Sequence, residues 1–199
     1  MNRFKLLLNS PYLFWGLLAL PSIGMISGFL GGDSSAHRLL HPTGEFAARF
    51  MILAMMITPL RMLFANARWP LWLVRRRRYL GVAAFGYATL HVLFYIIDEE
   101  SFSNIIAEAL QLSIWTGWVA FLIFIPLFMT SNDWAVRKLK RTWKPLQRWV
   151  YAAALLTLAH WIFLEYDFGP ALVHFLPLAA LETFRVLRGS VPSRVASRA

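Results

Sequence analysis

The chain of 199 residues contains no cysteine. Its absence excludes disulfide bonds, thiolate metal sites and a covalently attached c-type haem, which requires a C-x-x-C-H sequence. Charged residues are also scarce, at 15% of the chain, and there are 10 acidic residues against 20 basic ones. Any site for a transition metal or a haem must therefore depend mainly on the five histidines.

Apolar residues make up 58% of the chain, and the mean hydropathy is +0.53. They occur in six blocks, at about 12–30, 46–64, 80–97, 112–129, 149–165 and 170–187. Because about 20 apolar residues cross the hydrocarbon core of a bilayer as a helix, the blocks predict an all-α integral membrane protein with six transmembrane helices. Pro21 predicts a kink in the first of them. Residues 1–188 are expected to form one domain, and 189–199 a disordered cytoplasmic tail.

The basic residues lie between the apolar blocks, where they orient helices, so the net charge of +10 does not indicate a nucleic-acid partner. The links after the second and fourth blocks are rich in bases: Arg61, Arg68, Arg75, Arg76, Arg77, Arg78, Arg137, Lys138, Lys140, Arg141, Lys144 and Arg148. The link after the third block carries acids and no base: Asp98, Glu99, Glu100 and Glu108. Positive charge marks the cytoplasmic side, so both termini are predicted to be inside.

Two histidines fall at matching depths in this topology. His91 lies thirteen residues after Arg78, and His160 lies twelve residues after Arg148. Both helices run outward, so both imidazoles are expected at one level in the outer half of the membrane. A haem held between two histidines of facing helices requires this arrangement. The alternative, two core histidines with separate hydrogen-bond partners, explains each residue but not their shared depth.

The other candidate residues lie near the outer side. His174, close to the start of the sixth block, is a candidate substitute ligand or an interfacial histidine bonded to water. His37 and His41 are expected in a solvated loop before the second helix, with Thr43 as a helix cap. Arg49 either extends to the lipid headgroups or binds a haem propionate, because an arginine fork suits a carboxylate.

Three stretches carry a family resemblance: HPTGEFAARFMILAMMITPLR (41–61), RRYLGVAAFGYATLHVLFY (77–95) and TSNDWAVRKLKRTWKPLQRWVYAAALLTLAH (130–160). Together they resemble the MsrQ (YedZ) family, the haem-binding membrane subunits of bacterial periplasmic protein-methionine-sulfoxide reductase systems, within the ferric-reductase-like transmembrane group. The resemblance implies a cytochrome b-like helical bundle in the bacterial inner membrane that holds b-type haem and FMN. By position, His91 and His160 match haem-associated histidines of the family.

The resemblance also implies a direction of electron flow, from a quinol or flavin donor to a periplasmic molybdenum-cofactor subunit, MsrP, which repairs oxidised methionine. On that reading the chain is an electron-transfer subunit and not the catalytic one. Gln147 stands where the family usually has a further histidine, so one haem is expected. Arg77 and Arg78 are candidates for holding a flavin phosphate.

Two other functions fit the sequence. One is a transmembrane reductase of ferric or other metal chelates, which keeps the haem and changes the electron acceptor. The other is a small transporter or structural membrane protein without haem, in which the histidines serve proton transfer or packing.

Overall fold

The computed structural model describes residues 10–165 and 168–189 of the chain; the tail was predicted at 189–199, of which Gly189 ends a helix and 190–199 lie outside the described residues. Within that part all regular structure is helical. The long helices are α2 (Pro11–Leu30), α3 (Ala36–Leu63), α5 (Arg77–Asp98), α7 (Leu112–Met129), α10 (Val150–Glu165) and α11 (Phe168–Gly189). Short helices connect them: α4 (Trp69–Val74), α6 (Phe102–Glu108), α8 (Asp133–Leu139), η1 (Lys140–Thr142) and α9 (Trp143–Gln147).

The length and composition of five described helices allow them to cross a membrane: α2, α3, α5, α7 and α11. Their most apolar segments have mean hydropathies between 1.3 and 2.0. Helix α10 is also largely apolar, but it has only 16 residues, which span about 24 Å at 1.5 Å per residue. The chain is therefore a multi-pass helical membrane protein, and the six predicted blocks each correspond to one long helix.

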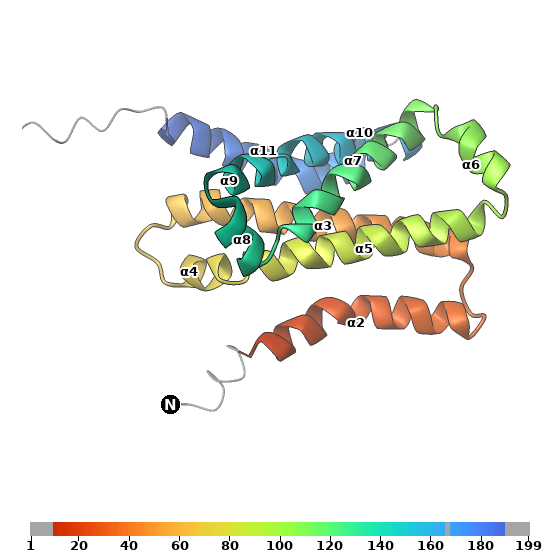
Figure 1. Ribbon diagram of the computed structural model, residues 1–199, viewed down its shortest axis with the longest axis horizontal. Coiled ribbons are helices and arrows are strands. Elements are labelled where there is room, and N and C mark those ends of the chain that lie inside the picture. The colour runs from red at the N-terminus through yellow and green to blue at the C-terminus, as the bar shows by residue number, and fades with distance from the viewer. Residues whose placement is uncertain (1–9, 166–167, 190–199) are drawn as a thin grey trace, which may run out of the picture.

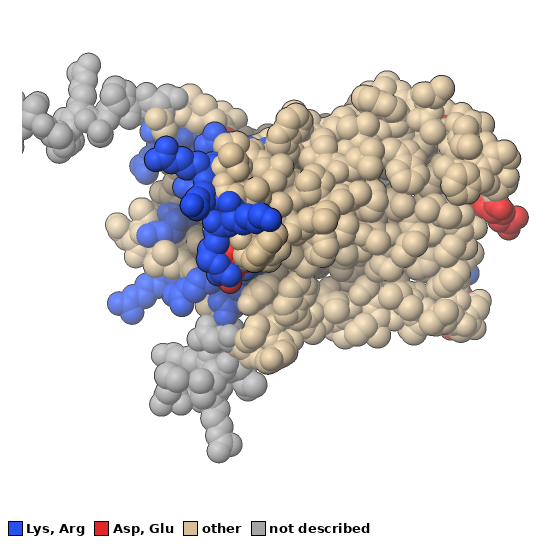
Figure 2. All heavy atoms as spheres, viewed as in Figure 1, with Lys and Arg blue, Asp and Glu red and all other residues tan. Residues whose placement is uncertain are grey.

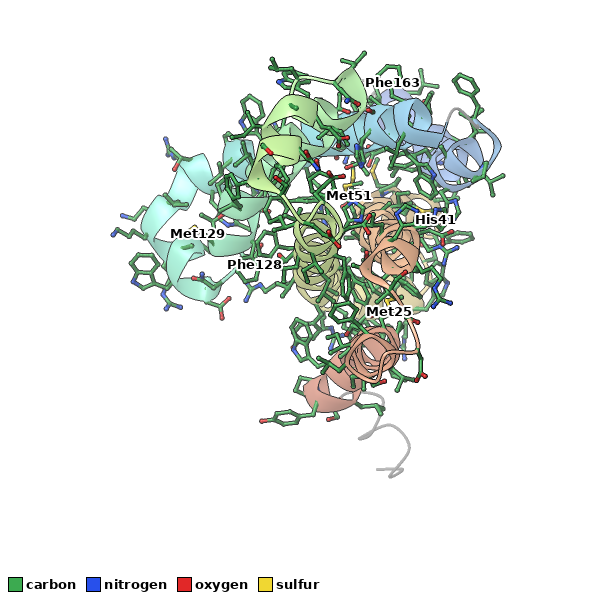
Figure 3. All side chains as sticks on the ribbon, turned by 90° about the vertical axis from the view of Figure 1, so that its right-hand side faces the viewer. Met25, His41, Met51, Phe128, Met129 and Phe163 are labelled. Atoms are coloured by element: carbon green, nitrogen blue, oxygen red, sulfur yellow. The ribbon has the colours of Figure 1, made fainter. Side chains whose placement is uncertain are left out.

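The long helices run along a common direction, and the short ones lie at the two ends (Figure 1). Helix α3 packs most extensively against α5, and α7 packs most extensively against α10. Each of these pairs is a helical hairpin, hairpin A (α3 and α5) and hairpin B (α7 and α10). Helix α11 covers α3 and α10, whereas α2 lies on the opposite side of hairpin A (Figure 3).

Charge separates the two ends of the bundle. Lysine and arginine side chains gather at the end where α4, α8 and α9 lie, and acidic side chains appear at the opposite end (Figure 2). The start of α2 and the end of α11 both lie at the basic end (Figure 1). Between the two ends the surface is almost free of charge, and large apolar side chains such as Leu17, Leu122 and Leu155 are 58–70% exposed. Such a belt suits contact with lipid rather than water.

Helix α3 begins about ten residues earlier than the sequence analysis predicted. Ser35 caps its first turn by accepting a hydrogen bond from the Arg38 N–H at 3.4 Å. His37 and His41 therefore lie in the helix and not in a loop, and the prediction that Thr43 is a cap is wrong. Pro42 and Pro59 both lie inside α3, because a proline in a membrane helix is tolerated where neighbouring groups satisfy the backbone.

Tyr87 joins α2 to hairpin A from the middle of α5. Its hydroxyl donates to the Leu18 carbonyl at 3.0 Å and accepts from the Ser22 N–H at 2.9 Å. These two groups of α2 pair with each other in an uninterrupted α-helix. The hydroxyl thus lies in the turn that contains Pro21, where the sequence predicted a kink.

Candidate haem-binding site

The structure brings His91 and His160 together, as their matched depths predicted. His91 comes from α5 of hairpin A and His160 from α10 of hairpin B. The centroids of their imidazole rings are 6.1 Å apart, and the ring planes are inclined at 81°. Neither ring stacks on the other, so the two histidines face each other edge to face across the space between the hairpins.

The separation of the rings fits a metal ion between them. Imidazole nitrogens bind first-row metal ions at about 2.0–2.1 Å. With about 1.1 Å from each nitrogen to its ring centroid, two imidazoles on opposite sides of one metal have centroids about 6.3 Å apart. The observed 6.1 Å agrees with this value. The same centroid distance is also usual for an edge-to-face pair of aromatic rings, so the assignment as ligands depends on the cavity between the rings and on the ring tautomers as well.

The two rings line a cavity of about 390 Å³ between the hairpins. This volume lies within the range of about 300–1,000 Å³ that is typical of ligand and cofactor sites. Most lining side chains are small or apolar, among them Ala48, Met51, Ala88, Ala120, Phe121, Phe124 and Leu164. At the acidic end the lining becomes polar, with His37, His41 and Glu45. A flat apolar group with a polar edge would match this lining.

Both histidines are held by backbone carbonyl groups of the partner helix in their hairpin. The Nδ1 atom of His91 lies 2.9 Å from the Leu40 carbonyl oxygen, and that of His160 lies 2.5 Å from the Ser113 carbonyl oxygen. A carbonyl can only accept, so Nδ1 carries the proton in each ring. The lone pair is then on Nε2, which is the tautomer that binds a metal through Nε2.

Glycine makes room for each ring. A Cβ atom on Gly44 would lie 3.1 Å from Nδ1 of His91, and one on Gly117 would lie 2.8 Å from both Nδ1 and Cε1 of His160. A contact of 2.8 Å is too short for a Cβ atom, so a larger residue at Gly117 would displace the imidazole, and the contact of 3.1 Å at Gly44 would require the ring to move by a few tenths of an ångström. The residues present therefore fit a haem held by His91 and His160.

Arg49 has protein partners at the acidic end of the cavity. Its Nη2 atom pairs with Glu45 one turn earlier in α3, and its Nε atom donates to Nε2 of His174 at 3.0 Å. His174 also places its Nδ1 atom 2.7 Å from the Pro170 carbonyl oxygen. Both nitrogens of His174 are thus engaged, which does not favour it as a substitute ligand.

The cationic candidates at the basic end also have partners. Arg77 donates to the Thr58 hydroxyl at 3.3 Å, and Arg78 forms an ion pair with Asp133 at 2.7 Å. Arg78 lowers the pKa of Asp133 below its usual value, first by a hydrogen bond and then by its charge.

Gln147, at the end of α9, forms hydrogen bonds to the end of α7 at the basic end of hairpin B. Its Nε2 atom donates to the Leu127 carbonyl at 3.0 Å and to the Thr130 hydroxyl at 2.9 Å. Both partners lie at the end of α7. The side chain is used as a hydrogen-bond donor between helices, in a position where the related sequences were expected to carry a histidine.

Sequence reasoning missed three parts of the site: Glu45, and the two glycines beside the histidines. Glu45 looked like an ordinary surface acid because the helix was expected to begin after it. Either glycine taken singly is no signal, since a glycine inside an apolar block is common in membrane helices. The sequence did contain one usable sign, the dipeptide Thr-Gly at both 43–44 and 116–117.

Residues 43–158 match the family described as ferric reductase like transmembrane component. A protein of Rhizobium meliloti (strain 1021) is 32% identical over 93% of this chain and 92% of its own length. A protein of Xanthomonas euvesicatoria pv. vesicatoria is 35% identical over 86% of this chain and 78% of its own length. One of Brucella anthropi is 36% identical over 68% of this chain and 60% of its own length, so the match spans less than two thirds of that relative.

All three relatives bear the name protein-methionine-sulfoxide reductase heme-binding subunit MsrQ. No solved structure matches the chain.

Proposed function

Because the chain belongs to the MsrQ family of haem-binding subunits, within the ferric reductase like transmembrane family, we propose that it is a membrane electron-transfer haem protein serving a methionine sulfoxide reductase. The observation that carries this proposal is the pair of imidazoles at 6.1 Å in an apolar cavity between two hairpins. We propose His91 and His160 as the axial ligands of one b-type haem. Bound haem supplies one-electron exchange between ferric and ferrous iron.

The protein groups around this site have separate tasks. The Leu40 and Ser113 carbonyls fix the ring tautomers and orientations of the ligands, which raises the basicity of Nε2. The apolar lining keeps water from the ring faces. Glu45, Arg49 and His174 form a charged network at the acidic end, and the proposed contact of Arg49 with a propionate requires Arg49 to share or exchange its present partner.

Six membrane crossings with both termini inside remain our proposal for the topology. It is supported by the basic end of the bundle, where α2 starts and α11 ends (Figure 2). The positive-inside rule makes this the cytoplasmic side of a bacterial inner membrane. The acidic end, where His37, His41 and Glu45 line the cavity, then faces the periplasm. There we propose a periplasmic MsrP-like molybdenum-cofactor subunit as electron acceptor, with a quinol or a flavin, FMN bound near Arg77 and Arg78, as donor.

The test is an optical spectrum of the purified protein with His91→Ala and His160→Ala variants. Wild-type protein is expected to show a low-spin b-type spectrum when reduced, and each variant should lose most of its haem or become high-spin. Gly86→Ala is the control, because Gly86 lies in α5 with His91 but does not line the cavity, and a Cβ atom there meets nothing within 4 Å. Retention of full low-spin haem in both single variants would contradict the ligand assignment.

A second candidate function, reduction of ferric chelates at the outer face, is favoured by the family description alone. The two functions share the haem and differ in the acceptor. Stopped-flow oxidation of the reduced protein separates them. The reduced protein is mixed in one experiment with a periplasmic methionine sulfoxide reductase subunit and in a second experiment with a ferric chelate. Rapid oxidation by the chelate with none by the reductase subunit would favour the second function.

A further inference from the structure

The first hairpin holds its histidine with a short segment of α3. The Leu40 carbonyl accepts hydrogen bonds from Nδ1 of His91 at 2.9 Å and from the Thr43 hydroxyl at 3.0 Å. Thr43 is fully buried and also donates to the Leu39 carbonyl. Gly44, the next residue, lies under the ring. The segment thus offers a carbonyl, a threonine three residues later and a glycine four residues later.

The second hairpin repeats this arrangement with α7. The Ser113 carbonyl accepts from Nδ1 of His160 at 2.5 Å and from the Thr116 hydroxyl at 2.9 Å. Thr116 is 3% exposed and also donates to the Leu112 carbonyl at 2.8 Å. Gly117 lies under the ring. The spacing of carbonyl, threonine and glycine is the same as in α3.

The order along the chain is also repeated. In each hairpin the first helix carries the Thr-Gly pair and the second carries the histidine. His91 follows its accepting carbonyl by 51 residues, and His160 follows its own by 47 residues. Nothing else in the two segments, LLHPTG and LSIWTG, is alike apart from the leading leucine. A shared geometry on such different sequences indicates a shared task.

We propose that these two Thr-Gly segments are matching cradles that position the ligand imidazoles, and that Gly44 and Gly117 are positioning residues of the site. The proposal rests on His91 and His160 being the ligands. A helix carbonyl lies close to its own backbone, so an imidazole can reach it only if no side chain stands one turn further along the same face. Glycine is the residue that allows this approach. The threonine hydroxyl satisfies the same carbonyl from within the helix and fills the space beside the ring.

A Cβ atom at either glycine would push the ring away from its carbonyl. The ligand would then lose the hydrogen bond that raises its basicity, and ferric iron would be less stabilised relative to ferrous iron. Three consequences are expected together: faster haem loss, a larger high-spin fraction and a higher midpoint potential. The effect should be larger for Gly117→Ala than for Gly44→Ala, because the new contacts are at 2.8 Å and 3.1 Å, respectively.

The experiment compares Gly117→Ala and Gly44→Ala with Gly86→Ala in the haem-loaded full chain. Gly86 lies in α5, the helix of His91, and a Cβ atom there meets nothing within 4 Å, so this variant makes the same chemical change in open space. Haem loss is followed by transfer to apomyoglobin, and the midpoint potential by a redox titration. We expect haem loss about 10- to 100-fold faster in Gly117→Ala, the usual range for removing support of a metal ligand, with a raised midpoint. Gly86→Ala should match the wild type in both.

A haem-free measurement keeps the proposal testable if Gly117→Ala binds haem too poorly to study. In the His160→Ala background the ring that the new Cβ would strike is gone. Gly117→Ala should therefore lower the thermal stability of the apoprotein only when His160 is present, a non-additive double-mutant cycle. Equal effects in both backgrounds, or unchanged haem loss and midpoint in Gly117→Ala, would overturn the cradle. A different result would contradict the proposed function itself, namely wild-type protein that binds no low-spin haem.

Discussion

The Tyr87→Phe substitution removes a single hydroxyl that joins α2 to hairpin A. The aromatic ring keeps its packing in the variant, because Phe46 and Phe50 contact the ring with centroids at 5.3 Å in both cases. What is lost is the pair of hydrogen bonds to the Leu18 carbonyl and the Ser22 N–H. The change therefore tests the polar connection of α2 separately from its apolar contacts.

The expected cost follows from these two bonds. Each buried hydrogen bond contributes about 0.5–1.5 kcal/mol, so the pair contributes about 1–3 kcal/mol. The loss is near 1 kcal/mol if α2 straightens in the variant and the Ser22 N–H bonds directly to the Leu18 carbonyl. Measured hydrogen bonds between membrane helices average about 0.6 kcal/mol, which also favours the smaller loss. At 1.4 kcal/mol per factor of ten, the local opening of α2 should become roughly 5- to 150-fold more frequent.

Hydrogen exchange of the protein in lipid nanodiscs measures this opening directly. Amides around Ser22 in the Tyr87→Phe variant are expected to exchange faster by that factor, whereas amides of α7 should not change. Tyr95→Phe is the matched control: Tyr95 lies on the same helix and its hydroxyl bonds to Glu108 at 3.4 Å, far from α2. Unchanged exchange at Ser22, or an equal increase in the control, would show that the hydroxyl does not hold α2.

Three further predictions concern the two ends of the bundle. Arg49→Leu should speed haem loss or shift the midpoint potential if Arg49 contacts a propionate, and no change in either would limit its role to the contacts with Glu45 and His174. Because Arg78 lowers the pKa of Asp133, their pair should stabilise the fold above the ordinary aspartate pKa of 3.8 and cease to do so as the pH falls through the lower folded value. Thermal melts in detergent should therefore show less acid destabilisation for Asp133→Asn than for the wild type below pH 3.8. Haem measured as pyridine haemochrome should give one haem per chain, because Gln147 is a bound amide donor and not a ligand; a ratio near two would contradict this.

Much of the helix order could be predicted from the sequence, because lengths of apolar sequence translate directly into helix lengths. The meeting of His91 and His160 was also predictable. Residue counts from the basic links give depth along parallel helices, and the two rings do lie beside each other, with centroids 6.1 Å apart. Depth alone does not give rotation about the helix axis, so the sequence could not establish that both rings point into one cavity.

The start of α3 was not predictable by the same reasoning. His41 and Pro42 read as a loop because proline lacks an N–H and disfavours the helix interior, while the Ser35 cap gave no stronger signal than Thr43. The network of Glu45, Arg49 and His174 depends on this early start, since it requires the first turns of α3 to lie beside α11. The start of α3 therefore depends on long-range packing between α3 and α11, which the local sequence does not reveal.

The division of the two histidines between hairpins has a consequence for how the protein is made. Both partners of the His91 hydrogen bond lie in hairpin A and are synthesised before the helices that carry Gly117 and His160. Until hairpin B has entered the membrane and docked, an imidazole on one side is all that a haem would meet. If His91 and His160 are the ligands, haem can bind only after both hairpins are in place, and a chain that stops after α7 should be inserted, helical and colourless.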